Sequence, residues 1–327
     1  MGSSRSIAVL IRQRLEAAAA GGALGGLGAL PGAYRYRLAG ALAAAATGVD
    51  RRHYRIARES LILRYGPERA GQRARAAFRE LGHLLAEVPL LEGCASEAMP
   101  GLVTAVEGQE HLDAAVADPR GTLVLTGHVG NWEIMGHVLI QYGLAPLHGI
   151  YRPLENPYLD ARLRATRGRS GAGTISRWNA SRPVLQALRK GEAVAVLPDQ
   201  FPRGKGRIWL PFLGEATQFQ SAPVRLALRS GAPILPVFLL REGVERFRLV
   251  AFPRIEPGDY PDDDNGVRDL GAAMVAALEV GIARAPAQWF WFHRRWRHEP
   301  RALIEGGPPP PPWGGEVVVG GSEAEAP

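Results

Sequence analysis

Apolar side chains in the first hundred residues recur at the three- and four-residue spacing of amphipathic helices. One stripe opens the chain and a second runs from Phe78 to Val88, where Pro89 is expected to end the helix. Between them, residues 51–64 read as a basic helix with apolar positions on one side. The pattern predicts a helical region over residues 1–100.

From about residue 105, short apolar runs alternate with helical segments. The expected strands are 122–126, 148–151, 193–197, 208–212, 234–240 and 247–251. The expected helices are 131–141, 156–169, 180–189, 221–229 and 267–283. This alternation predicts an α/β fold with a mostly parallel central sheet flanked by helices. We expect that domain to cover residues 101–305 and to pack with the N-terminal helices as one unit.

Residues 306–327 have a different composition, with five consecutive prolines at 308–312 and an end rich in Glu, Ala and Gly. Such a segment cannot bury a core, so a disordered tail is predicted.

Charge is distributed unevenly along the chain. The 327 residues carry a formal charge of +7, yet residues 1–80 alone hold 14 arginines against five acids. The most apolar N-terminal stretches, 17–30 and 38–49, consist mainly of Ala and Gly, so neither a transmembrane helix nor a signal peptide is expected. A single cysteine, Cys94, excludes an internal disulfide framework. The basic region fits an anionic membrane surface, nucleic acid or an acidic substrate.

The strongest chemical signal is the segment Gly-His-Val-Gly-Asn-Trp-Glu over residues 127–133, directly after the strand 122–126. Sites of α/β folds lie at the carboxyl ends of parallel strands. With His128 in the loop and Glu133 in the first helical turn, the carboxylate is expected to fold back onto the imidazole. A histidine held by a carboxylate is suited to act as a general base. The alternative is a core histidine and a solvated glutamate that share no function.

Several other kinds of chemistry lack their motifs. There is no His-x-x-x-His spacing, no Gly-x-Ser-x-Gly elbow, and no glycine-rich loop for ATP or NAD. No metal and no cofactor are therefore expected. Direct attack by a substrate hydroxyl that His128 deprotonates is the simplest mechanism.

The same residues resemble a known family. His128 and Glu133 in their setting resemble the lipid A late (lauroyl and myristoyl) acyltransferases of the lysophospholipid acyltransferase superfamily. Further blocks agree in order, and the resemblance covers about residues 50–298: Tyr151-Arg152-Pro153, Leu197-Pro198-Asp199-Gln200, Leu210–Gly214, Ala232-Pro233 and Gln288–Trp296. The basic segment 201–205 and residues 215–219 depart from the usual pattern, which puts the acceptor more in doubt than the reaction.

The resemblance implies a membrane-associated O-acyltransferase. His128 would be the general base, assisted by Glu133, and Arg152 would bind substrate or stabilise charge. Asn131, Asp199 and Gln200 are assigned to substrate binding, although a structural turn at 199–200 is an equal alternative. The donor would be a thioester of acyl carrier protein or CoA, and the acceptor a hydroxyl of a lipid A precursor or related glycolipid. The protein would lie peripherally on the cytoplasmic face of the inner membrane, with its basic helices on the anionic surface.

Other functions remain open at this point. The acceptor could be a phospholipid or another lipid, and the protein could bind lipid without catalysis. A nucleic-acid-binding protein is a further alternative, although aromatic residues are not interleaved with the arginines. The aromatic run 289–296 could belong to the core or to a membrane interface.

Overall fold

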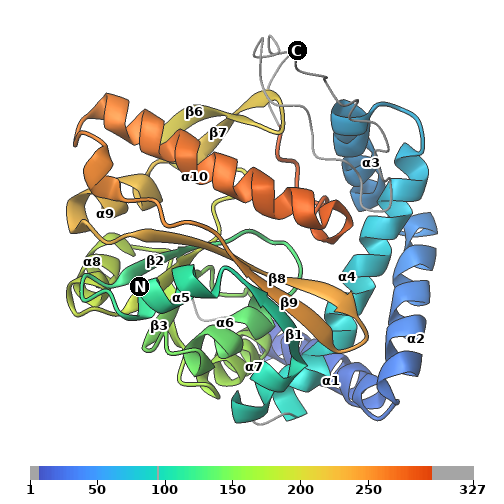
Figure 1. Cartoon of the computed structure of the whole chain (residues 1–327). Coiled ribbons are helices and arrows are strands. Elements are labelled where there is room, and N and C mark those ends of the chain that lie inside the picture. The colour runs from blue at the N-terminus through green and yellow to red at the C-terminus, as the bar shows by residue number, and fades with distance from the viewer. Residues whose placement is uncertain (1–6, 94–95, 297–327) are drawn as a thin grey trace, which may run out of the picture.

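A seven-stranded sheet lies at the centre of the protein in the computed structural model, which describes residues 7–93 and 96–296 (Figure 1). Its strands follow the spatial order β1-β9-β8-β2-β5-β3-β4. Only the β8–β9 pair is antiparallel. The strands are β1 (Val103–Glu107), β2 (Thr122–Leu125), β3 (Leu147–Tyr151), β4 (Gly173–Ser176), β5 (Ala193–Val196), β8 (Ile234–Gly243) and β9 (Arg246–Ala251). The predicted α/β fold with a mostly parallel sheet is confirmed.

Helices cover both faces of this sheet (Figure 1). They are α5 (Gln109–Val116), α6 (Trp132–Gln141), α7 (Pro157–Gly168), α8 (Ser181–Arg189), α9 (Ala222–Ser230) and α10 (Asp264–Arg284). Successive side chains of a strand point to opposite faces. Leu123 and Leu125 of β2 accordingly enter one apolar core and Val124 enters the other. The uninterrupted apolar run of β2 thus reflects burial on both faces.

The N-terminal helices form a layer beside the sheet. They are α1 (Ile7–Gly28), α2 (Gly32–Ala45), α3 (Arg51–Tyr65) and α4 (Ala70–Gly93). Helix α2 buries Tyr36 and Ala39 against Ala86 of α4. Ala57 and Leu61 of α3 enter one of the two sheet cores. The basic helix expected over residues 51–64 is confirmed as α3.

Helix α4 corrects one expectation. It continues through Pro89 to Gly93 rather than ending there. Leu90 and Leu91, just after the proline, are 7% and 5% exposed. They pack in the apolar core that also contains Val124 of β2. Their burial offsets the hydrogen bond that the proline removes from the helix.

Some elements have weak sequence signals and were not anticipated. These are β1, α5, β4 and strand β7 (Glu215–Gln220), which pairs antiparallel with β6 (Arg207–Phe212) outside the main sheet. Short 3₁₀ turns lie at η1 (Ala46–Gly48), η2 (Ser96–Leu102), η3 (Pro257–Asp259) and η4 (Pro286–Gln288). Helix α10 begins three residues before the expected helix 267–283, and Asp263 caps its first turn.

Within the described ranges, no helix combines the length and apolar character needed to cross a bilayer. The tail predicted over residues 306–327 lies outside the described residues.

Candidate active site

His128 lies in the loop between β2 and α6, and its closest polar partner is Asp199. Nδ1 of the imidazole lies 2.7 Å from Oδ1 of Asp199, and the His128 backbone N–H donates to Oδ2 at 2.8 Å. The His128 side chain is 21% exposed, whereas that of Asp199 is 1% exposed. The Nδ1 edge of the imidazole is therefore held by a buried carboxylate, while part of the side chain stays accessible.

Strand order brings these two residues together. Strand β2 pairs in parallel with β5, with Leu125 opposite Val196. His128 lies three residues beyond Leu125, and Asp199 lies three residues beyond Val196. Both residues therefore lie at the carboxyl edge of the sheet, beside each other. The sequence analysis assigned Asp199 to substrate binding, whereas in the structure its carboxylate is the partner of the imidazole.

The remaining contacts define which imidazole nitrogen is basic. Trp289 donates its indole N–H to Oδ2 of Asp199 at 2.9 Å, so the carboxylate is satisfied on both oxygens. With Nδ1–H donating to Asp199, Nε2 carries the lone pair. The Gln200 amide nitrogen lies 3.3 Å from that Nε2. The tautomer is thus the one that a general base requires.

Asp199 is ionised in this site. Burial acts to raise the pKa of its carboxyl, but attraction to His128 and hydrogen bonds from His128 and Trp289 outweigh burial and lower that pKa. The carboxylate therefore stays charged throughout the neutral range and orients the imidazole.

The loop backbone is fixed on both sides. The Phe290 N–H donates to the carbonyl of His128 at 2.9 Å, and the Asn131 N–H donates to the carbonyl of Leu239 at 2.9 Å. Between these bonds Gly130 has a φ of +63°, and a Cβ there would lie 2.0 Å from the Leu239 carbonyl oxygen. Only glycine fits both the conformation and the close approach.

This geometry makes a paired prediction. Gly130→Ala should lower the free energy of unfolding by about 1–3 kcal/mol from backbone strain alone and displace His128. Gly136→Ala, in helix α6 with no atom within 4 Å of the added Cβ, should raise it by about 0.5–1 kcal/mol. Urea denaturation of both variants measures the difference. Equal stabilities would contradict the fixed loop geometry.

Glu133 does not contact His128, and the predicted contact is wrong. Its carboxylate receives hydrogen bonds from Nε and Nη2 of Arg167 in α7, at 2.9 and 2.6 Å. The capped first turn of α6 directs Glu133 toward α7, away from the imidazole. Burial acts to lower the pKa of Arg167, and the bonds and charge of Glu133 raise it. The Arg167 guanidinium also lies 5.7 Å from the ring centroid of Tyr151.

Asn131 also differs from expectation, whereas the role expected of Arg152 stays a prediction. Asn131 is fully buried; its Oδ1 accepts from the Ile134 N–H at 2.8 Å and its Nδ2 donates to Glu87 at 2.6 Å. Its side chain therefore offers no group to a substrate, which corrects its assignment to substrate binding. Arg152 follows β3 at the carboxyl edge, where it makes an exposed 3.4 Å ion pair with Glu155.

Sequence reasoning missed Trp289, Arg167 and the buried ion pair of Glu87 with Arg241. Trp289 had a signal in the aromatic run, whose members Trp289, Trp291 and Phe292 are 4%, 1% and 7% exposed. The core interpretation of those three residues is thus confirmed. Among the described residues, no group of three or more His, Cys, Asp or Glu side chains could hold a metal ion.

A mostly parallel α/β sheet with a carboxylate-held histidine at its carboxyl edge is an arrangement that can support acid–base chemistry. Comparison with known proteins agrees. A family model described as bacterial lipid A biosynthesis acyltransferase matches residues 4–298. The chain belongs to this family of acyltransferases.

Individual relatives are consistent with that membership. The lipid A biosynthesis palmitoleoyltransferase of Escherichia coli K12 is 32% identical over 256 residues, which cover 76% of this chain and 80% of the relative. The lauroyltransferase of the same pathway in that organism is 30% identical over 203 residues, 61% of this chain and 64% of the relative. The phosphatidylinositol mannoside acyltransferase of Mycolicibacterium smegmatis is 24% identical over 192 residues, 57% of this chain and 60% of the relative.

Proposed function

We propose that this protein transfers a fatty acyl chain from the thioester of acyl carrier protein or CoA to a hydroxyl of a lipid A precursor or related glycolipid. The single observation that carries the chemistry is the His128–Asp199 pair, which leaves Nε2 as the base. The names of the relatives support the acceptor class, because both lipid A and phosphatidylinositol mannoside are glycolipids.

The proposed reaction proceeds in two stages. Nε2 of His128 takes the proton of the acceptor hydroxyl as its oxygen attacks the thioester carbonyl. The tetrahedral intermediate then collapses, the carbon–sulfur bond breaks, and the imidazolium returns the proton to the leaving thiolate. Asp199 stabilises the imidazolium between these two stages. The products are an ester and a free thiol, and no external oxidant or reductant is consumed.

Two further roles complete the proposal. Arg152 would bind an anionic group of the substrate or the oxyanion, because its exposed pair with Glu155 is worth about 1 kcal/mol or less and is easily exchanged. Glu133 would hold Arg167 against Tyr151 and so fix the end of β3 that carries Arg152. Gln200 would donate to the acceptor oxygen beside Nε2.

The function is tested by lipid mass spectrometry of host cells with and without the protein, followed by transfer assays with acyl-carrier-protein and acyl-CoA donors. We expect one glycolipid to gain the mass of one acyl chain. A mass gain confined to a phospholipid would favour the alternative acceptor. Unchanged lipids, together with no transfer from either donor, would contradict the proposal.

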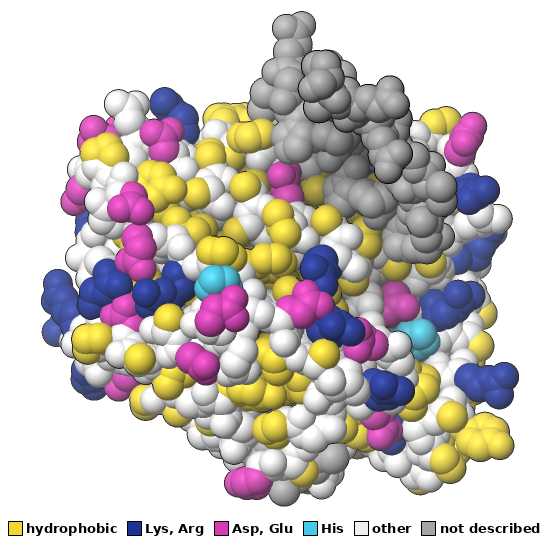
Figure 2. All heavy atoms as spheres, viewed as in Figure 1, with side chains coloured by type: hydrophobic (Ala, Val, Ile, Leu, Met, Phe, Trp, Pro, Cys, Tyr) yellow, Lys and Arg dark blue, Asp and Glu magenta, His cyan; other side chains and the backbone are white. Residues whose placement is uncertain are grey.

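Membrane docking is the second part of the proposal. Helices α1 and α2 and the turn after α2 expose large apolar side chains: Ile11, Leu15, Tyr34, Leu38, Leu42 and Val49, from 45% to 89% exposed. Next to Val49, a hollow of about 460 Å³ is lined by Arg51, Arg55 and Arg58. Figure 2 shows Lys and Arg among hydrophobic side chains along the rim on the side of the N-terminal helices. Apolar side chains beside arginines suit an anionic lipid surface on the cytoplasmic face of the inner membrane.

Point substitutions test docking without disturbing the core. Leu38→Glu combined with Leu42→Glu should weaken binding to phosphatidylglycerol vesicles by about tenfold or more, because each leucine loses its apolar contact with lipid. The matched control is Val116→Glu on α5, which is 42% exposed in the native protein and should bind normally. Vesicle sedimentation measures both. Equal binding of all three proteins would contradict docking through α2.

A further inference from the structure

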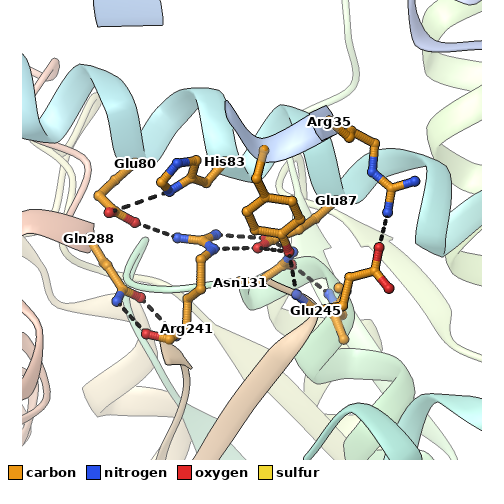
Figure 3. Close-up of polar contacts among 10 residues, drawn as sticks. Arg35, Glu80, His83, Glu87, Asn131, Arg241, Glu245 and Gln288 are labelled. Atoms are coloured by element: carbon orange, nitrogen blue, oxygen red, sulfur yellow. Dashed lines mark hydrogen bonds and ion pairs between the residues drawn. The ribbon is translucent and has the colours of Figure 1, made fainter. Parts of the chain in front are cut away.

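Behind the active site, Glu87 of α4 is a completely buried carboxylate (0% exposed) that gathers four hydrogen bonds. Tyr36 donates to Oε1 at 2.7 Å, Asn131 donates to Oε2 at 2.6 Å, and Arg241 donates to both oxygens. Figure 3 shows Asn131, from the loop that carries His128, and Arg241, from β8, pointing toward Glu87. A buried charge is tolerated only when it is paired in this way.

One of these bonds ends in the catalytic loop. Asn131 closes the segment that carries His128, and its Oδ1 is already used to cap α6. Its Nδ2 is left for Glu87. Glu87 therefore fixes the far end of the loop, three residues beyond the imidazole.

A second set of hydrogen bonds connects Glu87 with the segment that holds Asp199. The backbone N–H of Arg241 donates to Oε1 of Gln288 at 2.9 Å, and Nε2 of Gln288 donates back to the Arg241 carbonyl at 2.8 Å. The next residue is Trp289, whose indole N–H holds Asp199. The Arg241 guanidinium is bound by Glu87 and, at 2.6 Å, by Glu80. Burial acts to lower the pKa of Arg241, and the bonds to Glu87 outweigh it and raise that pKa, so the guanidinium stays charged.

We propose that Glu87 is a positioning residue for acyl transfer: through Asn131 it fixes the loop of His128, and through Arg241 and Gln288 it fixes the segment that holds Asp199. This inference rests on the proposed function of His128 and Asp199. Glu87 touches neither of them, but a displacement of about 1 Å between reacting groups can cost about 10²-fold in rate. Tyr36 connects helix α2 to the same hydrogen-bond network. Its hydroxyl donates to Glu87 and accepts the backbone N–H of Glu245 at 3.1 Å.

Asn131→Ser gives the mildest test. Serine retains the N-cap of α6 but lacks the amide that donates to Glu87. We expect kcat to fall by about 10- to 100-fold while KM for donor and acceptor changes less than twofold. The matched control is Asp263→Ser, which makes the same kind of cap exchange on α10 and should leave kcat unchanged. A normal kcat per folded molecule for Asn131→Ser would overturn the proposal.

An exchange of partners tests Glu87 itself. Glu87→Gln and Asn131→Asp should each lower kcat, since the first removes the charge facing Arg241 and the second places two carboxylates together. The double variant again has one amide and one carboxylate, with their places exchanged. Its kcat should be at least tenfold higher than that of either single variant. A double variant no better than the worse single variant would contradict a positioning bond between these residues.

A spectroscopic measurement separates this inference from the proposed function. In protein labelled with ¹⁵N-histidine, the Nδ1–H resonance of His128 is assigned by its absence in His128→Gln. We expect it to shift or broaden in Asn131→Ser and to stay in place in Asp263→Ser. If the wild type transferred no acyl group, the proposed function would fail, yet this resonance would still report the coupling. A resonance unmoved in Asn131→Ser would overturn the inference alone.

Discussion

Replacing His128 with alanine should reduce the rate of acyl transfer by about 10²- to 10⁴-fold, the usual contribution of a general base. Asp199 binds the imidazole through Nδ1 and leaves the lone pair on Nε2, and the His128 side chain is 21% exposed. Without it, the acceptor hydroxyl has no base to remove its proton. Single-turnover transfer from a labelled thioester donor to a glycolipid acceptor measures the loss.

The control for this experiment is His111→Ala on α5, whose imidazole contacts Glu110 at 3.5 Å. It should retain the wild-type rate. His128→Gln should be made in parallel, because glutamine can leave an amide donor near the buried Asp199 carboxylate. Activity of His128→Ala within threefold of wild type would rule out the general-base assignment.

Asp199→Asn should reduce the rate by a comparable factor, about 10²- to 10⁴-fold. Asparagine fits the same space, but its amide nitrogen can turn toward Nδ1 and favour the tautomer that has its proton on Nε2. It also lacks the charge that stabilises the imidazolium. Near-ultraviolet circular dichroism of the surrounding tryptophans should confirm that the fold is kept.

The informative comparison is with Glu133→Gln. Glu133 binds Arg167 and not His128, so its substitution should cost less than that of Asp199. The sequence analysis assigned the assisting carboxylate to Glu133, and the relative size of the two losses therefore distinguishes the assignments. A larger loss in Glu133→Gln than in Asp199→Asn would contradict the role proposed for Asp199.

Much of the fold could be predicted from local pattern. The continuous apolar runs 123–125 and 193–197 arise because β2 and β5 are covered on both faces, and this signal needs no knowledge of neighbours. Strands β4 and β7 were missed because their residues carry little local signal. Helix α4 passes Pro89 because Leu90 and Leu91 are held by the core, and propensity alone cannot report such contacts.

Part of the site could be predicted in the same way. His128, Asp199 and Gln200 each follow a buried strand, so the sequence placed them on one edge of the sheet. It could not decide which carboxylate meets the imidazole. Asn131 is a similar case, because its position beside His128 suggests substrate contact while its side chain faces the buried Glu87.

The sequence by itself determined the class of fold, the loop that carries His128 and the edge of the sheet on which that loop lies, because strand period and chain order are local properties. Only the tertiary structure decided the partner of the imidazole. Asp199 is 71 residues from His128 in the chain and lies beside it because β2 and β5 pair in parallel and in register. Glu133, five residues away, is turned toward Arg167 by the left-handed Gly130 and the capped start of α6. Contacts between strands depend on their order in the sheet, and separation along the chain does not encode that order.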